Sequence, residues 1–281
     1  MSRPRLTRRG RIALTASAVL TVAVAVLVPV LTLTGGDGDG AKRPALVVPE
    51  GRRAGQVYAA VDEALRLPGG TAAKAALSAE LPLPKAARGN PEGYLFPATY
   101  PVEASTTPAG LLRYMVATAH ERFGSGSGSG GGAAGSRSAR DRADAATYRT
   151  VTIASIVQAE ADTPADMGKV ARVVHNRLAL GMPLQMDSTI NYALDRSTLD
   201  TSHRDTKTDS PFNTYGHKGL PPTPIGNPGE EAMRAAAAPP PGDWLYFVTV
   251  KPGDTRFTHR YAEQRRNVEE FNRNRAGATA G

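Results

Sequence analysis

The stretch TYRTVTIASIVQAEADTPADMGKVARVVHNRLALG, Thr147–Gly181, predicts two consecutive helices. Its first half is apolar with helical periodicity as far as Ala161. The second helix is expected to start after Thr163, a favourable N-cap residue followed by Pro164, and to stop at Gly181. Apolar residues three and four positions apart form one face of that second helix. The pair of helices is therefore expected to lie at the centre of a hydrophobic core.

Glu160 lies on the apolar face of the first of these helices. It follows Val157 by three positions and Ile156 by four, so the three side chains share a face. Burial disfavours an ionised carboxylate, so we expect the pKa of Glu160 to be raised and its carboxyl to stay protonated. A general acid requires this state. The alternative is a structural ion pair with Arg172 or Arg177, which from this residue alone is the commoner arrangement.

Composition excludes several classes of protein. The chain has 281 residues and no cysteine, which rules out disulfides, a thiol nucleophile and thiolate metal sites. Its net charge is +8, but five arginines lie within residues 1–11, which leaves +3 for the other 270 residues. The basic pI therefore does not indicate a nucleic-acid partner. No histidine spacing typical of a zinc site occurs, and we expect neither a metal nor a cofactor.

Residues 12–33 contain no charged side chain. A helix of this length would span roughly 33 Å, enough for the hydrocarbon core of a bilayer. The arginines before it predict a cytoplasmic N-terminus, with the rest of the chain outside the cell membrane. A signal peptide cleaved after Ala23–Ala25 is the alternative, but the apolar run continues beyond it and favours an uncleaved anchor. We expect a basic tail at 1–11, a transmembrane signal anchor at 12–34 and a spacer at 35–44.

The remaining pattern predicts an α+β fold. GSGSGSGGGAAGS, Gly124–Ser136, is a low-complexity linker, and we expect a flexible insertion over 124–146. WLYFVTV and the segment after KPGD predict a β-hairpin, followed by a charged helix. The further expected helices cover Gln56–Leu67, Thr71–Glu80, Leu111–Phe123 and about 261–274.

Two irregular segments carry clustered polar and aromatic side chains. Gln185 and Asp187 precede Ser188, which we expect to cap a helix, and Asn213 and Tyr215 lie beside a proline-rich loop. Amide groups can hydrogen-bond sugar hydroxyls, and aromatic rings can stack on sugar faces, so the segments favour a sugar-binding groove. The same residue types also build ordinary turns, and this alternative stays open.

Five motifs, in order, cover about 90–260. They are EGYLFPATY (Glu92–Tyr100), IASIVQAEA (Ile153–Ala161), VARVVHNRLALGMPLQMDSTINYAL (Val170–Leu194), SPFNTYGHKGLPPTPIGNPG (Ser210–Gly229) and WLYFV (Trp244–Val248). Together they closely resemble the YceG-like family, whose members are endolytic murein transglycosylases of the MltG type.

The resemblance implies a membrane-bound catalytic domain at 87–275, preceded by a partial LysM-like segment at 45–86 and followed by a disordered tail at 276–281. It implies cleavage of the β-1,4 bond between N-acetylmuramic acid and N-acetylglucosamine in nascent peptidoglycan, with 1,6-anhydro ends as products. The resemblance puts the catalytic glutamate of the family in the motif that reads SIVQAEA here. Gln158 occupies the other position, which is often acidic in relatives, so Glu160 is the only carboxylate left to match it. The groove positions match Glu92, Gln185, Asp187, Asn213 and Tyr215. No metal or cofactor is implied; peptidoglycan strands are the substrate, and peptidoglycan synthases are candidate partners.

Two alternatives remain at this point. A hydrolytic muramidase would need a second carboxylate, roughly 5–5.5 Å from Glu160 for retention or 6.5–9.5 Å for inversion. Asp187 and Glu92 are the candidates. A non-catalytic, membrane-tethered protein that binds or organises the cell wall is the second alternative.

Overall fold

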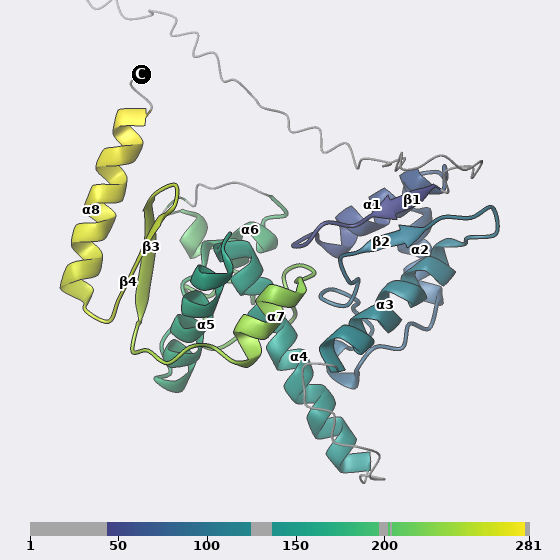
Figure 1. Cartoon of the computed structure of the whole chain (residues 1–281), viewed down its shortest axis with the longest axis horizontal. Coiled ribbons are helices and arrows are strands. Elements are labelled where there is room, and N and C mark those ends of the chain that lie inside the picture. The colour runs from purple at the N-terminus through teal and green to yellow at the C-terminus, as the bar shows by residue number, and fades with distance from the viewer. Residues whose placement is uncertain (1–43, 125–136, 197–201, 203, 279–281) are drawn as a thin grey trace, which may run out of the picture.

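The computed structural model describes residues 44–124, 137–196, 202 and 204–278. These residues form two lobes (Figure 1). The N-terminal lobe comprises residues 44–124, and the C-terminal lobe comprises the described residues from 137 onward. Both contain helices and short antiparallel strands, so the α+β fold is confirmed.

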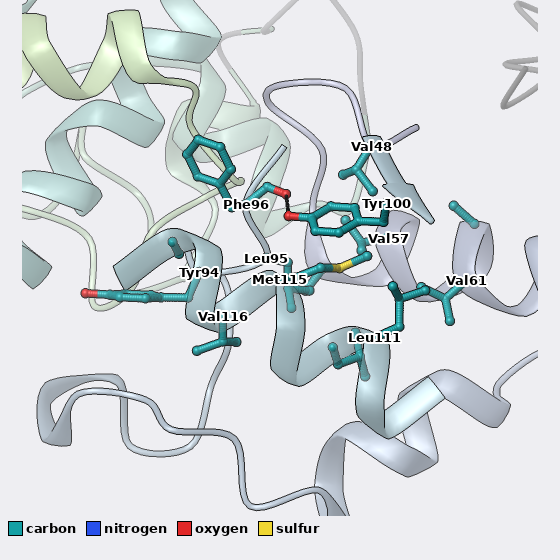
Figure 2. Close-up of a cluster of buried hydrophobic side chains, with 14 of the residues drawn as sticks. Val48, Val57, Val61, Tyr94, Leu95, Phe96, Tyr100, Leu111, Met115 and Val116 are labelled. Atoms are coloured by element: carbon teal, nitrogen blue, oxygen red, sulfur yellow. Dashed lines mark hydrogen bonds between the residues drawn. The ribbon is translucent and has the colours of Figure 1, made fainter. Parts of the chain in front are cut away.

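The N-terminal lobe pairs two short strands over three helices. Its elements are β1 (Ala45–Val47), α1 (Ala54–Ala64), α2 (Thr71–Ser78), the 3-10 turn η1 (Lys85–Ala87), β2 (Thr99–Pro101) and α3 (Pro108–Gly124). The strands are antiparallel, with Leu46 opposite Tyr100. Figure 2 shows the core of this lobe, in which the Tyr100 hydroxyl donates to the Phe96 carbonyl (2.6 Å).

The predicted boundary between 45–86 and the catalytic domain passes through this core. β1 lies before the boundary and pairs with β2, which lies after it. Apolar side chains of α1 and α3, including Val57 and Met115, pack in the same cluster (Figure 2). A three-residue strand cannot satisfy its backbone groups without a partner, so segment 45–86 folds together with 87–124.

The C-terminal lobe is a group of helices with a β-hairpin at one side. Its elements are α4 (Arg137–Glu160), α5 (Pro164–Ala179), α6 (Asp187–Ala193), the 3-10 turn η2 (Asp205–Lys207), α7 (Glu230–Ala237), β3 (Tyr246–Lys251), β4 (Asp254–Thr258) and α8 (Tyr261–Ala278). α7 packs on both α4 and α5, and α8 packs along β3 (Figure 1). The predicted hairpin and C-terminal helix are confirmed. α8 continues to Ala278, so the predicted disordered tail is wrong for 276–278, and residues 279–281 lie outside the described residues.

α4 joins the two lobes, because it contributes to both hydrophobic cores. Val151 belongs to the core of the N-terminal lobe, whereas Ile156 and Val157 belong to the core of the C-terminal lobe. The helix also begins earlier than expected. Residues 137–146 are helical, so the predicted flexible insertion over 124–146 is wrong for this part, and residues 125–136 lie outside the described residues. Alanine and arginine favour helix here, so the helix extends beyond its packed part.

The second helix of the central pair matches its predicted limits. The Thr163 hydroxyl accepts a hydrogen bond from the Asp166 N–H (3.2 Å), and Pro164 occupies the first turn of α5. Gly181, with φ of +63°, follows the helix in the left-handed region that glycine adopts readily.

Within the residues that the structure describes, no helix is both long and apolar enough to span a bilayer. The predicted membrane segment at 12–34 lies outside those residues.

Candidate active site

Glu160 is the last residue of α4 and is half-buried. Ile156 and Val157, on the same helical face, are fully buried, as the spacing predicts. The Glu160 Oε1 accepts a hydrogen bond from the Ser188 N–H (3.2 Å). The carboxyl group therefore lies between the end of α4 and the first turn of α6.

The pKa of Glu160 is raised from its ordinary value, chiefly because the carboxyl is removed from water. Hydrogen bonding to Ser188 opposes this shift, and the negative charge of Asp187 adds to it. The direction is the one that keeps a general acid protonated.

The alternative ion pair with an arginine is not formed. Arg172 donates to the carbonyls of Pro239 and Pro240, at 2.8 Å and 2.6 Å. Arg177 donates to the carbonyls of Leu184 and Leu245, both at 2.7 Å. Both arginines are occupied by backbone oxygens, so within the described residues neither neutralises Glu160.

Ser188 has a different role from the predicted helix cap. α6 begins at Asp187, its N-cap is Met186, and no side chain caps it. Ser188 is already inside the first turn, where its N–H has no partner within the helix and is free to bind Glu160. The expected cap is wrong because the helix starts two residues earlier, with Met186 and not Ser188 as its N-cap.

Asp187 and Tyr215 form a direct pair. The Tyr215 hydroxyl donates to the Asp187 Oδ1 at 2.5 Å. Burial, the hydrogen bond to Asp187 and the charges of Asp187 and Glu160 all raise the pKa of Tyr215. Asp187, Glu160 and Tyr215 therefore interact electrostatically and form one cluster beside the end of α4.

The side chains of the neighbouring Asn213 and Thr214 form hydrogen bonds with backbone groups. The Asn213 side chain donates to the carbonyls of Thr206 (3.1 Å) and Thr208 (2.8 Å) and accepts from the Tyr215 N–H (3.0 Å). The Thr214 hydroxyl accepts from the Met186 N–H (3.0 Å). Asn213 therefore matches the alternative of a turn-building residue, and both residues are buried under the cluster.

Gln185 is exposed and adopts φ of +54°, which is unusual for a residue other than glycine. Its N–H donates to the Thr214 carbonyl (3.0 Å), and its amide oxygen accepts from Arg177 (3.2 Å). The side chain is thus exposed beside the cluster, as a groove residue must be.

The sequence predicts Arg177 only as a candidate ion-pair partner of Glu160, and its role in holding backbone was missed. It is only 6% exposed, and its guanidinium holds the segment before α6 and stacks over the Tyr246 ring (5.2 Å). Burial lowers its pKa. The available signal was its position seven residues after Val170 and three after Val174, on the apolar stripe of α5.

Gln158 points to another part of the molecule. Its amide oxygen accepts the N–H of Gly229, the N-cap residue of α7, at 3.0 Å. Two residues apart on a helix, Gln158 and Glu160 lie on nearly opposite faces. A glutamine is sufficient for this contact, because only an acceptor oxygen is required.

Glu92 is separate from the Glu160 cluster. It is 3% exposed, and its carboxylate accepts hydrogen bonds from the Ala54 N–H (2.9 Å), the Asn227 side chain (3.3 Å) and the Tyr192 hydroxyl (3.1 Å). Burial raises its pKa to about 7, against the lowering effect of the Ala54 and Tyr192 hydrogen bonds and of the Arg53 charge. Glu92 was expected to line the sugar-binding groove, but it is buried, and a sugar could reach it only by displacing these three donors.

The backbone next to Glu92 is equally restricted. Gly93 has φ of +88°, and a Cβ at this position would lie 2.7 Å from side-chain atoms of Val151 and Pro224. Only glycine fits this conformation and this contact. The position of Glu92 is therefore set by close packing between the lobes.

The structure thus brings Glu160, Asp187, Tyr215 and Gln185 to one place, puts Asn213 beneath them, and puts Glu92 at the junction of the lobes. The hydrolytic alternative needs a second carboxylate, and the candidates are Asp187 and Glu92. Each of them already accepts a hydrogen bond from a tyrosine hydroxyl.

Comparison with known proteins agrees with the motifs. The model of the YceG-like family matches residues 10–270, so the chain belongs to the YceG-like family and the predicted resemblance is confirmed. The endolytic murein transglycosylase of Bacillus subtilis (strain 168) is 33% identical over 181 residues, 64% of this chain and 48% of that protein. The endolytic murein transglycosylase of Streptococcus pneumoniae serotype 2 is 33% identical over 190 residues, 66% of this chain and 33% of that protein.

A solved structure has the same fold. The crystal structure of a yceG-like protein from Listeria monocytogenes matches with a TM-score of 0.64 and 27% identity, over 80% of this chain and 76% of that one. Against the curated relatives, the chain spans between a third and a half of their length.

Proposed function

We propose that this protein is an endolytic lytic transglycosylase of peptidoglycan. It cleaves the β-1,4 bond between N-acetylmuramic acid and N-acetylglucosamine in nascent strands, leaves 1,6-anhydro ends and thereby terminates strand elongation. The observation that carries the proposal is Glu160, a half-buried carboxyl with raised pKa, hydrogen-bonded to a backbone N–H and not to an arginine. The names of the curated relatives support the same reaction.

The geometry of Glu160 suits an acid that later acts as a base. Because Oε1 accepts the Ser188 N–H, the proton of the acid form belongs on Oε2. That proton passes to the leaving glycosidic oxygen as the C1–O bond breaks. The resulting carboxylate then removes the proton of the C6 hydroxyl, and the C6 oxygen bonds to C1. The Glu160 carboxyl is protonated again at the end of the reaction, and no water is consumed.

Asp187 and Tyr215 supply the electrostatics around this step. Burial chiefly favours the protonated form of Glu160 before reaction, and the Asp187 charge adds to this effect. The same charge favours the positive oxocarbenium-like centre that develops at C1. The Tyr215 hydroxyl holds the Asp187 carboxylate in position (2.5 Å). Exposed Gln185, beside them, is available to bind sugar hydroxyls or acetamido groups.

A hydrolytic reaction is the second candidate, because Asp187 lies close enough to influence Glu160 electrostatically. The two reactions differ in product: hydrolysis leaves a reducing end, and the lytic reaction leaves a 1,6-anhydro end. Mass spectrometry of glycan strands digested by the wild type and by Glu160→Gln tests both. Anhydro ends from the wild type alone support the proposal; reducing ends contradict it, and no cleavage favours a wall-binding scaffold.

We also propose that residues 12–34 anchor the chain in the cell membrane, with the N-terminus cytoplasmic and both lobes outside. The 22 uncharged residues at 12–33 support the anchor, and the preceding arginines support its orientation. The order strand–helix–helix–strand in 45–101 is compatible with a glycan-binding role for the N-terminal lobe. Membrane fractionation and protease access to intact cells test the anchor: protein released by high salt, or protected from external protease, contradicts it.

A further inference from the structure

The junction of the two lobes is built around Glu92. Its three donors come from three separate parts of the chain: the start of α1 (Ala54), the end of α6 (Tyr192) and the segment before α7 (Asn227). Tyr192 and Asn227 belong to the C-terminal lobe, 100 and 135 residues from Glu92. A buried carboxylate that serves donors from both lobes joins them at a defined distance.

α6 is held at both ends by carboxyl groups. Its first turn provides the Ser188 N–H to Glu160 (3.2 Å), and its last turn provides the Tyr192 hydroxyl to Glu92 (3.1 Å). A helix of seven residues is only about 10 Å long and internally hydrogen-bonded. A displacement at the Tyr192 end is therefore transmitted to the Ser188 end.

Arg53 reinforces the same end of α6. Its guanidinium donates to the Arg196 carbonyl (2.7 Å), contacts Asp195 (3.3 Å) and lies over the Tyr192 ring (5.1 Å). The N-terminal lobe thus holds the C-terminal end of α6 through two charged side chains, Glu92 and Arg53. The N-terminal end of the helix carries Asp187 and Ser188, which act on Glu160.

We propose that Glu92 is a positioning residue of the active site: through the Tyr192 hydroxyl it fixes α6, and α6 in turn sets the Ser188 N–H and Asp187 against Glu160. The inference rests on the proposed function and assigns to Glu92 a role other than contact with sugar. Small misplacements of a catalytic group reduce turnover strongly without abolishing substrate binding. The effect should therefore fall on kcat more than on KM.

The experiment compares two tyrosines. Tyr192→Phe removes only the hydroxyl that binds Glu92, and the ring keeps its place against Arg53. Tyr100→Phe is the matched control, because it also removes a buried hydroxyl with one acceptor, the Phe96 carbonyl in the core of the N-terminal lobe (Figure 2). Each variant loses one donated hydrogen bond, to Glu92 or to the Phe96 carbonyl, so similar decreases in Tm are expected.

On glycan strands, Tyr192→Phe is expected to lower kcat about tenfold with KM nearly unchanged, because α6 is no longer fixed. Tyr100→Phe should keep the kcat of the wild type. Equal kcat values for the two variants would overturn the proposal, since Tyr192 would then be a structural contact only.

A measurement independent of turnover separates this inference from the proposed function. Hydrogen bonding to Ser188 lowers the pKa of Glu160 more than the Asp187 charge raises it. Loosening α6 should therefore raise this pKa further, which carboxyl NMR titration of the full chain measures. A shift in Tyr192→Phe but not in Tyr100→Phe supports positioning, even if the wild type cleaves no glycan and the proposed function fails. An unchanged Glu160 titration in Tyr192→Phe overturns the positioning role, even if the wild type cleaves normally.

Discussion

Two carboxyl groups, Glu160 and Glu92, have raised pKa values for the same first reason, removal from water. Their surroundings differ. Glu160 is half-buried and accepts one backbone N–H, whereas Glu92 is almost fully enclosed and accepts three donors from three segments. A raised pKa therefore does not by itself identify a catalytic acid. A catalytic acid must also reach its substrate, so its carboxyl needs an oxygen without a fixed donor and exposure to solvent.

The largest expected difference between the two sites is in cleavage. Glu160→Gln removes the proton donor that we propose and should lower the cleavage rate by about a thousandfold or more. Glu92→Gln keeps an oxygen that can accept the Tyr192 hydroxyl, so it should lose about tenfold at most. Both rates are measured on the same glycan strands by chromatography of the products. If Glu92→Gln were as inactive as Glu160→Gln, the contrast between the two sites would be wrong.

The second difference is in stability against pH. The pKa of Glu92 is about 7 in the folded protein and 4.5 ordinarily, so between these values the folded state binds more protons. The stability that Glu92 contributes is present below pH 4.5 and is lost as the pH rises through 7. Relative to Glu92→Gln, the wild type should lose about 3 kcal/mol of unfolding free energy between pH 4.5 and 8.

Urea unfolding at a series of pH values measures this difference. Glu160 is present in both proteins, so its own titration cancels to first order. Parallel stability curves for the wild type and Glu92→Gln would mean that Glu92 does not titrate in this range.

A third test concerns the charge beside Glu160. Because the Asp187 charge raises the pKa of Glu160, Asp187→Asn should move the alkaline limb of the kcat/KM profile to lower pH. Asp141→Asn is the control: it lies nineteen residues earlier on α4, about 28 Å away along the helix and beyond the screening distance. A limb that moves to higher pH, or moves equally in both variants, would refute the assigned electrostatics.

The smallest effect is expected at Gln158. Gln158→Glu restores an acid at this position but leaves an oxygen to accept the Gly229 N–H, on the face away from Glu160. The cleavage rate should stay within about twofold of the wild type, as for substitutions outside the site. A tenfold gain in the same product assay would show that Gln158 lies in the catalytic machinery after all.

The sequence by itself determined the parts that depend on local order. The periodicity of 147–181 predicted both central helices, the Thr163 cap and the common face of Glu160, Val157 and Ile156, because helix geometry relates residues only three or four positions apart. The motifs also placed the chain in its family.

The tertiary structure alone decided which polar groups contact Glu160 and which contact Glu92. Ser188 reaches Glu160 across 28 residues, and Glu92 meets Tyr192 across 100. No local pattern encodes these contacts, since they arise only when two lobes pack and the buried donors must find acceptors. Glutamate is therefore a half-buried carboxyl with one backbone donor at Glu160, the proton donor that we propose, and an enclosed carboxyl between the lobes at Glu92.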